Sequence, residues 1–182
     1  MIKIGSHNVG RIAERIVANE LEARGFRVSD LNKEGTAANA DLLAVSRRKA
    51  LALQIQVKGS TNGPKEPLWV GYGHLTKEIL AGNQKMFNRG KHSFYKAHFV
   101  VLVAVCSPTK YWCFVLPIDV AERAAQFHIA AYRDRGWKPG RTRLTLKPGP
   151  RAKKSDPRVA KACKLLALHQ DEKGWKRLIH SN

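Results

Sequence analysis

Residues 51–58 alternate apolar and polar side chains with a period of two, which predicts a β-strand that packs on a core through one face. The apolar face carries Leu51, Leu53, Ile55 and Val57, and the polar face carries Ala52, Gln54, Gln56 and Lys58. Residues 41–45 (Asp-Leu-Leu-Ala-Val) precede a basic turn at residues 47–49 and predict the other arm of a hairpin. The chain is therefore expected to contain a β-sheet with one strongly apolar face.

The polar side of this hairpin combines three different groups: the Asp41 carboxylate, the Gln56 amide and the Lys58 ammonium. Burying such groups is unfavourable unless each finds a partner, so their convergence indicates a site. An acid, an amide oxygen and a lysine are suited to holding a hard divalent cation and a water molecule beside a phosphate.

The composition points to a polyanionic partner. The 182 residues include 33 Lys and Arg against 14 Asp and Glu, a formal net charge of +19. A compact protein this positive repels itself, so nucleic acid is the expected partner. An anionic membrane surface fits less well, because the sequence shows no long basic amphipathic helix with an aromatic apolar face.

The sequence is that expected of a cytoplasmic protein. No apolar run approaches the roughly 20 residues that span a bilayer, and residues 1–5 lack the apolar region of a secretory signal. The three cysteines, Cys106, Cys113 and Cys163, have no metal-binding spacing. Cys106 and Cys113 flank a predicted hairpin turn and could be cross-strand neighbours, but free thiols in a reducing compartment are the favoured interpretation.

Helical periodicity and turn residues divide the chain into elements. Helices are predicted from the caps at residues 6–8 to Gly25, over residues 75–86, from a cap at Asp119 to about residue 135, and from Pro157 onward. Strands are predicted from residue 26, at residues 41–45, 51–58, 98–105 and 111–118, and briefly at residues 144–146. Residues 32–39 and 59–67 are predicted loops.

This order predicts an α/β protein with a single mixed sheet flanked by helices. With 43% hydrophobic residues, the chain is long enough for one domain with a sizeable core. We expect a core domain at residues 1–135 and a basic C-terminal extension at residues 136–182, whose helix packs on the same domain.

The first third of the chain resembles the PD-(D/E)XK nuclease superfamily, which has the restriction-endonuclease-like fold. The resemblance rests on Gly10-x-x-x-Glu14 in the first helix, the acidic segment Ala40-Asp41-Leu-Leu-Ala, and the strand Ile-Gln56-Val57-Lys58-Gly-Ser. These features occur in the order of the family. The resemblance implies an α-β-β-β-α-β core, a nuclease activity and a Mg²⁺ or Mn²⁺ cofactor.

The resemblance also implies roles for individual residues. Asp41 would be the central metal ligand, Gln56 a second ligand through its side-chain oxygen, and the Val57 carbonyl a third. Lys58 would orient the attacking water and neutralise charge on the phosphate. Glu14 would approach from the helix as an outer ligand or general base.

Two positions depart from the family pattern. Ala40 stands where the family has proline, and Gln56 stands where Asp or Glu is usual. An amide oxygen still ligates Mg²⁺, but it carries no charge and should weaken metal affinity. A protein that keeps the fold and DNA binding but has lost cleavage is therefore an alternative.

Each candidate residue also has a structural interpretation. Asp41 could accept backbone hydrogen bonds at the end of the loop, and Lys58 could simply reach solvent. Glu14 lies on the flank of the apolar stripe of its helix, while Glu20 lies nearer the centre and is the rival carboxylate. Gln54, two residues before Gln56, is a further possible site residue but fits a structural role more readily.

Residues 133–164 contain twelve basic residues and only two acidic ones, which suits contacts with phosphates. The predicted nucleic-acid-binding residues are Arg141, Arg143, Lys147, Arg151, Lys153, Lys154, Arg158, Lys161 and Lys164. A solvated helix face preceded by a basic linker is the alternative. Lys65 and Trp69 follow Lys58 in the chain and could reach a groove or stack on a base, or could pack internally.

The sequence thus predicts a metal-dependent DNA endonuclease that hydrolyses phosphodiester bonds through the Asp41, Gln56 and Lys58 site. Its expected substrate is double-stranded or branched DNA. Cutting both strands of a duplex needs two sites, which is compatible with a homodimer, although the sequence indicates no interface. An RNA-binding or structural nucleoprotein is the second alternative.

Overall fold

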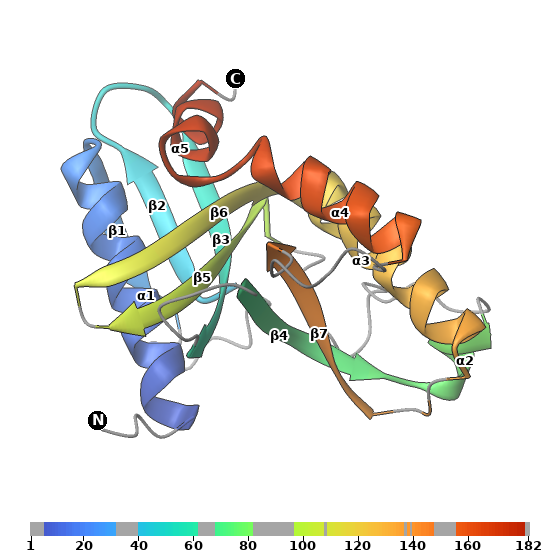
Figure 1. The fold of residues 1–182 in the computed structure, drawn as a ribbon. Coiled ribbons are helices and arrows are strands. Elements are labelled where there is room, and N and C mark those ends of the chain that lie inside the picture. Colours follow the sequence, from blue (N-terminus) through green and yellow to red (C-terminus); the bar gives the residue numbers. More distant parts are fainter. Residues whose placement is uncertain are drawn as a thin grey trace.

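A computed structural model of the protein describes residues 6–31, 40–61, 68–81, 97–107, 109–136, 138, 140–147 and 156–180. Its centre is a five-stranded sheet with the spatial order β1-β2-β3-β5-β6 (Figure 1). The strands are β1 (Phe26–Asp30), β2 (Leu42–Ser46), β3 (Ala52–Thr61), β5 (Phe99–Ser107) and β6 (Lys110–Pro117). All neighbours are antiparallel except β3 and β5, so the sheet is mixed.

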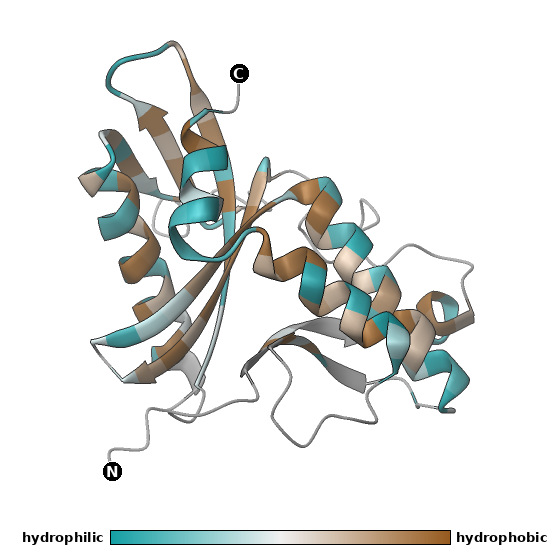
Figure 2. Ribbon diagram, turned by 45° about the horizontal axis from the view of Figure 1, so that its top comes forward, coloured by the Kyte–Doolittle hydropathy of each residue, from teal (hydrophilic) through white to brown (hydrophobic). Residues whose placement is uncertain are grey.

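Helices cover both faces of this sheet. The side chains of α1 (Ser6–Ala23) and α5 (Asp171–Ile179) share a buried cluster with one face of β1, β2, β3 and β5. On the other face, α2 (Lys77–Ala81), α3 (Ile118–Asp134) and α4 (Pro157–Ala167) pack against β5 and β6. Figure 2 shows hydrophobic and hydrophilic residues alternating along α1, α3 and α4, as expected for helices with one buried face. The predicted fold class, a mixed sheet flanked by helices, is confirmed.

The period-two pattern of β3 has the predicted structural consequence. Leu53, Ile55 and Val57 are buried against α1, and their cross-strand neighbours in β2 and β5 belong to the same cluster. The strand continues to Thr61, three residues beyond Lys58, so the start of the predicted loop at residues 59–67 is strand. Residues 62–67 and the predicted loop at 32–39 lie outside the described residues.

A separate two-stranded ribbon was not predicted. It pairs β4 (Leu68–Leu75) with β7 (Gly140–Lys147) in antiparallel register. The sequence predicted only residues 144–146 of β7 and no strand at β4, because Gly71 and Gly73 interrupt any clear alternation there. Pairing between segments this far apart in the chain leaves little local signal.

Several helix boundaries also differ from the prediction. Pro117, not Asp119, is the N-cap of α3, and it offers no side-chain hydrogen bond. The single helix predicted from Pro157 is two helices, broken after Ala167, and the second begins at Asp171 with a positive φ of 47°. Of the helix predicted at residues 75–86, α2 occupies 77–81, and the remainder from residue 82 lies outside the described residues. Gly25 ends the first helix with φ of 88°, as predicted.

The cysteines are free thiols in the structure. Cys113 pairs with Val103 across the β5–β6 hairpin, so Cys106 and Cys113 are not cross-strand partners. In the described part of the chain, no helix is long and apolar enough to cross a membrane.

Candidate active site

Asp41 lies at the point where the β2–β3 ladder ends. Its backbone N–H donates to the Ile55 carbonyl at 2.9 Å. Leu42, the first residue of β2, forms the terminal pair of the ladder with Ile55. The next N–H of β3 that faces β2 is that of Val57, which has no strand partner there. The Asp41 carboxylate accepts this N–H at 2.7 Å through Oδ2. Asp41 therefore accepts a backbone hydrogen bond, as its structural interpretation predicted, and this bond holds the carboxylate against β3.

Gln56 binds the same carboxylate oxygen. Its side chain is 3% exposed, and its Nε2 donates to Asp41 Oδ2. Because the amide nitrogen is used in this way, the carbonyl oxygen is the end of the side chain that can face a cation. The burial of Gln56 is thus compensated by a charged partner, as the sequence argument required.

Gly59 allows α1 to approach β3 closely. A Cβ atom at this position would lie 2.5 Å from the Ala13 Cβ and 3.1 Å from the Val9 carbonyl oxygen. Any other residue would push the helix away from the strand. The contact brings Glu14, the residue after Ala13, to the strand segment that carries Lys58, the residue before Gly59.

Glu14 is consequently in a crowded electrostatic environment. Its pKa is raised, first by burial and then by the negative charges of Asp41 and Asp30, while Lys58 and Arg11 act in the opposite direction. Glu14, Asp41 and Lys58 are therefore close enough to influence one another. An additional positive charge among these carboxylates would relieve the repulsion.

Asp30 lies beside the candidate site, near Glu14, and was not predicted from the sequence. It is the last residue of β1 and pairs with Leu42, the neighbour of Asp41. A signal existed in the sequence: an acidic residue at the end of the strand preceding Asp41 must lie at the same edge of an antiparallel sheet. Without knowledge of the β1–β2 register, this residue could not be distinguished from a solvent-exposed strand end.

Glu20, the rival carboxylate, lies in a different network. It accepts a hydrogen bond from the Tyr111 hydroxyl at 2.8 Å and forms an ion pair with Arg24. Arg24 in turn binds Glu172 at 2.8 Å and lies over the Trp175 ring, 5.0 Å from its centroid. Glu20 therefore joins α1 to β6 and α5, and Glu14 is the α1 acid beside Asp41.

The donor set suits a hard cation through oxygen atoms of mixed type. No group of three or more His, Cys, Asp or Glu side chains arranged to hold a metal ion occurs among the residues that the structure describes. The available donors are instead the Asp41 carboxylate, the Gln56 amide oxygen and the Val57 carbonyl. In a strand the N–H and C=O of one residue point to the same side, and the Val57 N–H points to Asp41. These oxygens are of the type that Mg²⁺ and Mn²⁺ prefer, whereas zinc sites use mostly Cys and His ligands.

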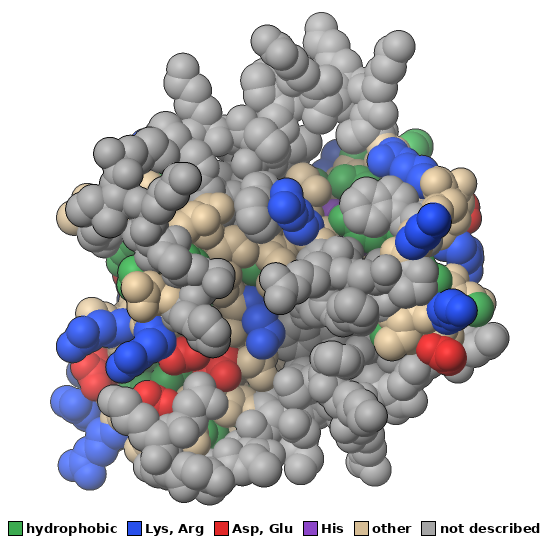
Figure 3. Space-filling model, turned by 90° about the horizontal axis from the view of Figure 1, so that it is seen from below, with side chains coloured by type: hydrophobic (Ala, Val, Ile, Leu, Met, Phe, Trp, Pro, Cys, Tyr) green, Lys and Arg blue, Asp and Glu red, His purple; other side chains and the backbone are tan. Residues whose placement is uncertain are grey.

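The molecular surface around this region combines both signs of charge. Viewed from below, acidic side chains gather on the side of α1, β1 and β2, with Lys and Arg side chains beside them (Figure 3). Arg11 and Arg15 of α1 are exposed, and Arg11 lies near enough to Glu14 to lower its pKa. Acidic groups surrounded by basic ones suit a cation beside a polyanion.

The remaining predicted residues are distributed differently. Gln54 is partly buried. Its backbone N–H donates to His98 Nδ1 at 2.9 Å, and its carbonyl accepts the His98 N–H at 2.8 Å. Lys65, Arg151, Lys153 and Lys154 lie outside the described residues. Trp69 lies in β4, and Arg141 and Lys147 lie in β7, but only their backbone positions are described.

The described basic residues of the C-terminal segment fall into two groups. Arg143, Lys161 and Lys164 are exposed. Arg158 instead binds Asp156 at 2.9 Å and also pairs with Asp134. The hydrogen bonds from Arg158 lower the pKa of Asp156 to about 2. Arg158 thus joins the start of α4 to the end of α3.

No known family model matches this chain, and no curated protein is similar to it in sequence. Among solved structures, the bacterial homing endonuclease I-Ssp6803I is similar, with a TM-score of 0.49 and 15% sequence identity. The similarity covers 96% of this chain and 91% of that one. A likeness of this degree does not indicate an activity, so the chemistry has to be argued from the residues of this chain.

Proposed function

We propose that this protein is a metal-dependent nuclease that hydrolyses phosphodiester bonds in DNA at the end of the β2–β3 ladder. The observation that carries the proposal is the hydrogen-bonded unit of Asp41, Gln56 and the Val57 N–H, with Glu14 and Lys58 beside it. The Asp41, Gln56 and Val57 groups meet through the β2–β3 pairing, and Glu14 joins them because α1 packs tightly at Gly59.

Mg²⁺ or Mn²⁺ would be held by the Asp41 carboxylate, the Gln56 amide oxygen and the Val57 carbonyl, with Glu14 as an outer ligand. When bound, the ion would supply Lewis-acid polarisation of the phosphate and a more acidic water molecule. Lys58 places a positive charge where negative charge grows on the phosphate during attack. Glu14, with its raised pKa, is suited to accept a proton from the attacking water.

DNA is the proposed substrate because of the charge of the whole chain. The net charge of +19 favours a polyanion, and exposed Arg and Lys side chains lie beside the acidic site. The alternative in which the protein binds DNA without cutting it is favoured by Gln56, which removes a negative charge from the usual ligand position. Both candidates share the same surface and differ in whether the site holds a cation tightly enough.

Cleavage of supercoiled plasmid in Mg²⁺ and in Mn²⁺ tests the proposal, with Lys58→Ala and Asp41→Asn as site variants. The Asn side chain keeps an oxygen for the Val57 N–H, so the strand end retains its hydrogen bond. We expect each variant to reduce nicking by about 100-fold or more. Lys49→Ala, which removes an exposed charge on the β2–β3 turn, is the control and should leave nicking unchanged.

Persistent nicking by both site variants would show that the site assignment is wrong. Tight binding without cleavage in either metal would favour the non-cleaving alternative. A Mg²⁺-dependent rise in melting temperature that disappears in Asp41→Asn provides a second measurement, independent of activity.

A further inference from the structure

One face of the β4–β7 ribbon is apolar and buried. Val70, Leu144 and Leu146 are buried in the cluster formed with α3 and α4. Arg143 is exposed, and its cross-strand partner is Gly71. A glycine within a strand often marks a place where another molecule's backbone approaches closely. The residue directly opposite Arg143 in β4 therefore has no side chain.

Side chains from α3 and α4 hold the outer edge of β7. The Thr145 N–H donates to His128 Nε2 at 3.1 Å, and the Cys163 thiol donates to the Thr145 carbonyl at 3.3 Å. The Tyr132 hydroxyl donates to the Arg143 carbonyl. These contacts satisfy edge backbone groups that could otherwise pair with another strand. They also fix the backbone of β7 at Arg143 and Thr145.

The ribbon is connected directly to the strand that carries Lys58. The Gly71 N–H donates to Ser60 Oγ at 3.0 Å, and Ser60 lies two residues after Lys58 in β3. At about 3.3 Å per residue along a strand and about 5 Å between neighbouring strands, the path from Lys58 to Arg143 is about 17 Å. Stacked base pairs are about 3.4 Å apart, so this path corresponds to about five base pairs.

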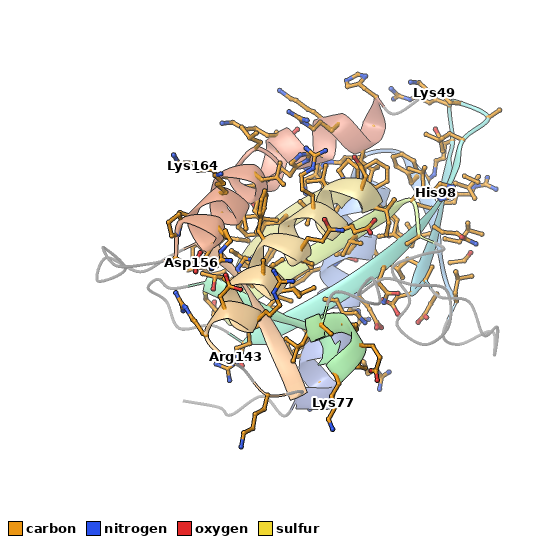
Figure 4. All side chains as sticks on the ribbon, turned by 90° about the vertical axis from the view of Figure 1, so that its right-hand side faces the viewer. Lys49, Lys77, His98, Arg143, Asp156 and Lys164 are labelled. Carbon is orange, nitrogen blue, oxygen red and sulfur yellow. The ribbon has the colours of Figure 1, made fainter. Side chains whose placement is uncertain are left out.

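The C-terminal end of β3, the strand that carries Lys58, lies on the same side of the molecule as the ribbon (Figure 1). In Figure 1 the end of β3 and the β4–β7 ribbon both occupy the lower part of the view. In Figure 4, Arg143 and Lys49 lie at opposite ends of the molecule, so the ribbon is far from the β2–β3 turn. One duplex lying along the lower side would meet both the site and the ribbon.

We propose that the β4–β7 ribbon enters the major groove of DNA and that Arg143 reads a guanine within about five base pairs of the cleaved bond. The proposal rests on the proposed function for the position of that bond. The major groove admits a two-stranded β-ribbon, and an arginine can bind O6 and N7 of guanine through two hydrogen bonds. A ribbon held rigidly at its backbone presents such a side chain in a defined position.

Selection of duplexes from a library with a randomised 16-base-pair centre tests this inference. Binding is measured in Ca²⁺ so that enrichment does not depend on cleavage. We expect the wild-type protein to enrich a motif that contains a guanine, preferred by about tenfold or more over other bases. Arg143→Lys keeps the charge but loses the planar fork, so it should bind the library with similar mean affinity and lose this preference.

Arg143→Ala should lose the preference as well, and Lys49→Ala, matched in charge, should retain it. Absence of any enriched motif with the wild type, or the same motif with both Arg143 variants, would overturn the inference. So would a uniform loss of affinity in Arg143→Ala with the motif unchanged, because that result describes a phosphate contact only.

Mapping of cut positions on the enriched duplex separates this inference from the proposed function. If the motif depends on Arg143 and the DNA is cut about five base pairs away, both proposals are supported. If the motif depends on Arg143 but no DNA is ever cut, reading of the groove by Arg143 is supported and the nuclease proposal fails.

Discussion

At the scale of single residues, the candidate site is a set of groups whose charges oppose one another. The Asp41 carboxylate is held by an amide and a backbone N–H, while Glu14 is left in a partly buried position close to Asp41 and Asp30. Such an arrangement is unfavourable in isolation and becomes favourable when a cation or a basic ligand is present. The site is therefore expected to weaken the fold slightly until it is occupied.

Glu14→Gln tests this expectation through stability. The raised pKa means that ionised Glu14 reduces stability above its folded-state pKa, and that the penalty vanishes below the ordinary value of 4.5. We expect the variant to melt at a higher temperature than the wild type at pH 7 without divalent ions, and at the same temperature near pH 4. The gain should be below about 1 kcal/mol because the side chain is partly solvent-exposed.

Thermal unfolding at the two pH values is the measurement, and Glu22→Gln, at an exposed position of the same helix, is the control. An equal change in both variants, or a gain that persists at pH 4, would contradict the electrostatic explanation.

At the scale of elements, the contact between α1 and β3 decides whether Glu14 reaches the site. Gly59 lies directly under Ala13, whereas Gly10, in the same helix, has open space around the position of a Cβ atom. The two glycines therefore provide a matched pair of substitutions. A substitution at Gly59 affects helix–strand packing, and a substitution at Gly10 affects helix propensity alone.

Gly59→Ala is expected to destabilise the protein by about 1–3 kcal/mol, because the helix must move away from the strand. Any nuclease activity should fall as well, since Glu14 moves with the helix. Gly10→Ala should instead stabilise by about 0.5–1 kcal/mol. Chemical denaturation of both variants is the measurement, and a neutral Gly59→Ala would show that the close approach is not required.

The attachment of β7 to α3 should depend on pH. His128 is fully buried, its Nδ1 lies 3.0 Å from the Ala124 carbonyl, and its Nε2 accepts the Thr145 N–H, so the ring is neutral. Burial lowers its pKa below the usual 6.5. The stabilisation of the fold by neutral His128 is therefore complete above pH 6.5, and it is lost as the pH falls towards the folded-state pKa of His128.

Hydrogen exchange at the Thr145 amide, referenced to exchange in β5, measures this effect. We expect protection at Thr145 to decrease below pH 6.5 before protection in β5 does. His169 is also buried with a lowered pKa, but its carbonyl binds the Val115 N–H of β6, so His169→Gln should leave the Thr145 profile unchanged. An unchanged profile in His128→Gln would contradict the assignment.

At the scale of the whole molecule, the positive charge is not equally available to a ligand. Arg158 is engaged by Asp156 and Asp134, while Lys161 and Lys164 on the same helix are exposed. The sequence predicted nucleic-acid binding for all three residues. In the structure one of them joins two helices, and the other two are exposed.

Measuring DNA affinity against salt concentration distinguishes these roles. Lys164→Ala is expected to reduce the slope of log affinity against log salt by about 0.9 if it contacts one phosphate. Arg158→Ala should leave that slope unchanged and lower the melting temperature, because Asp134 and Asp156 lose their closest cation. A larger slope change for Arg158→Ala than for Lys164→Ala would reverse the assignment.

The sequence alone determined the central hairpin and its polar residues. Hydrophobic alternation is a local property, so the buried face of β3, the position of Asp41 opposite it, and the β5–β6 hairpin could all be predicted from neighbouring residues. The excess of basic residues is likewise visible without a structure.

Only the tertiary structure decided which distant groups meet. The β4–β7 pairing, the arrival of Glu14 and Asp30 beside Asp41, and the engagement of Arg158 all join segments far apart in the chain. These contacts depend on strand register and on how closely α1 approaches Gly59, and neither leaves a periodic signal in the sequence. Packing at one glycine thus decides whether the predicted hairpin residues form a site with an acid from the helix.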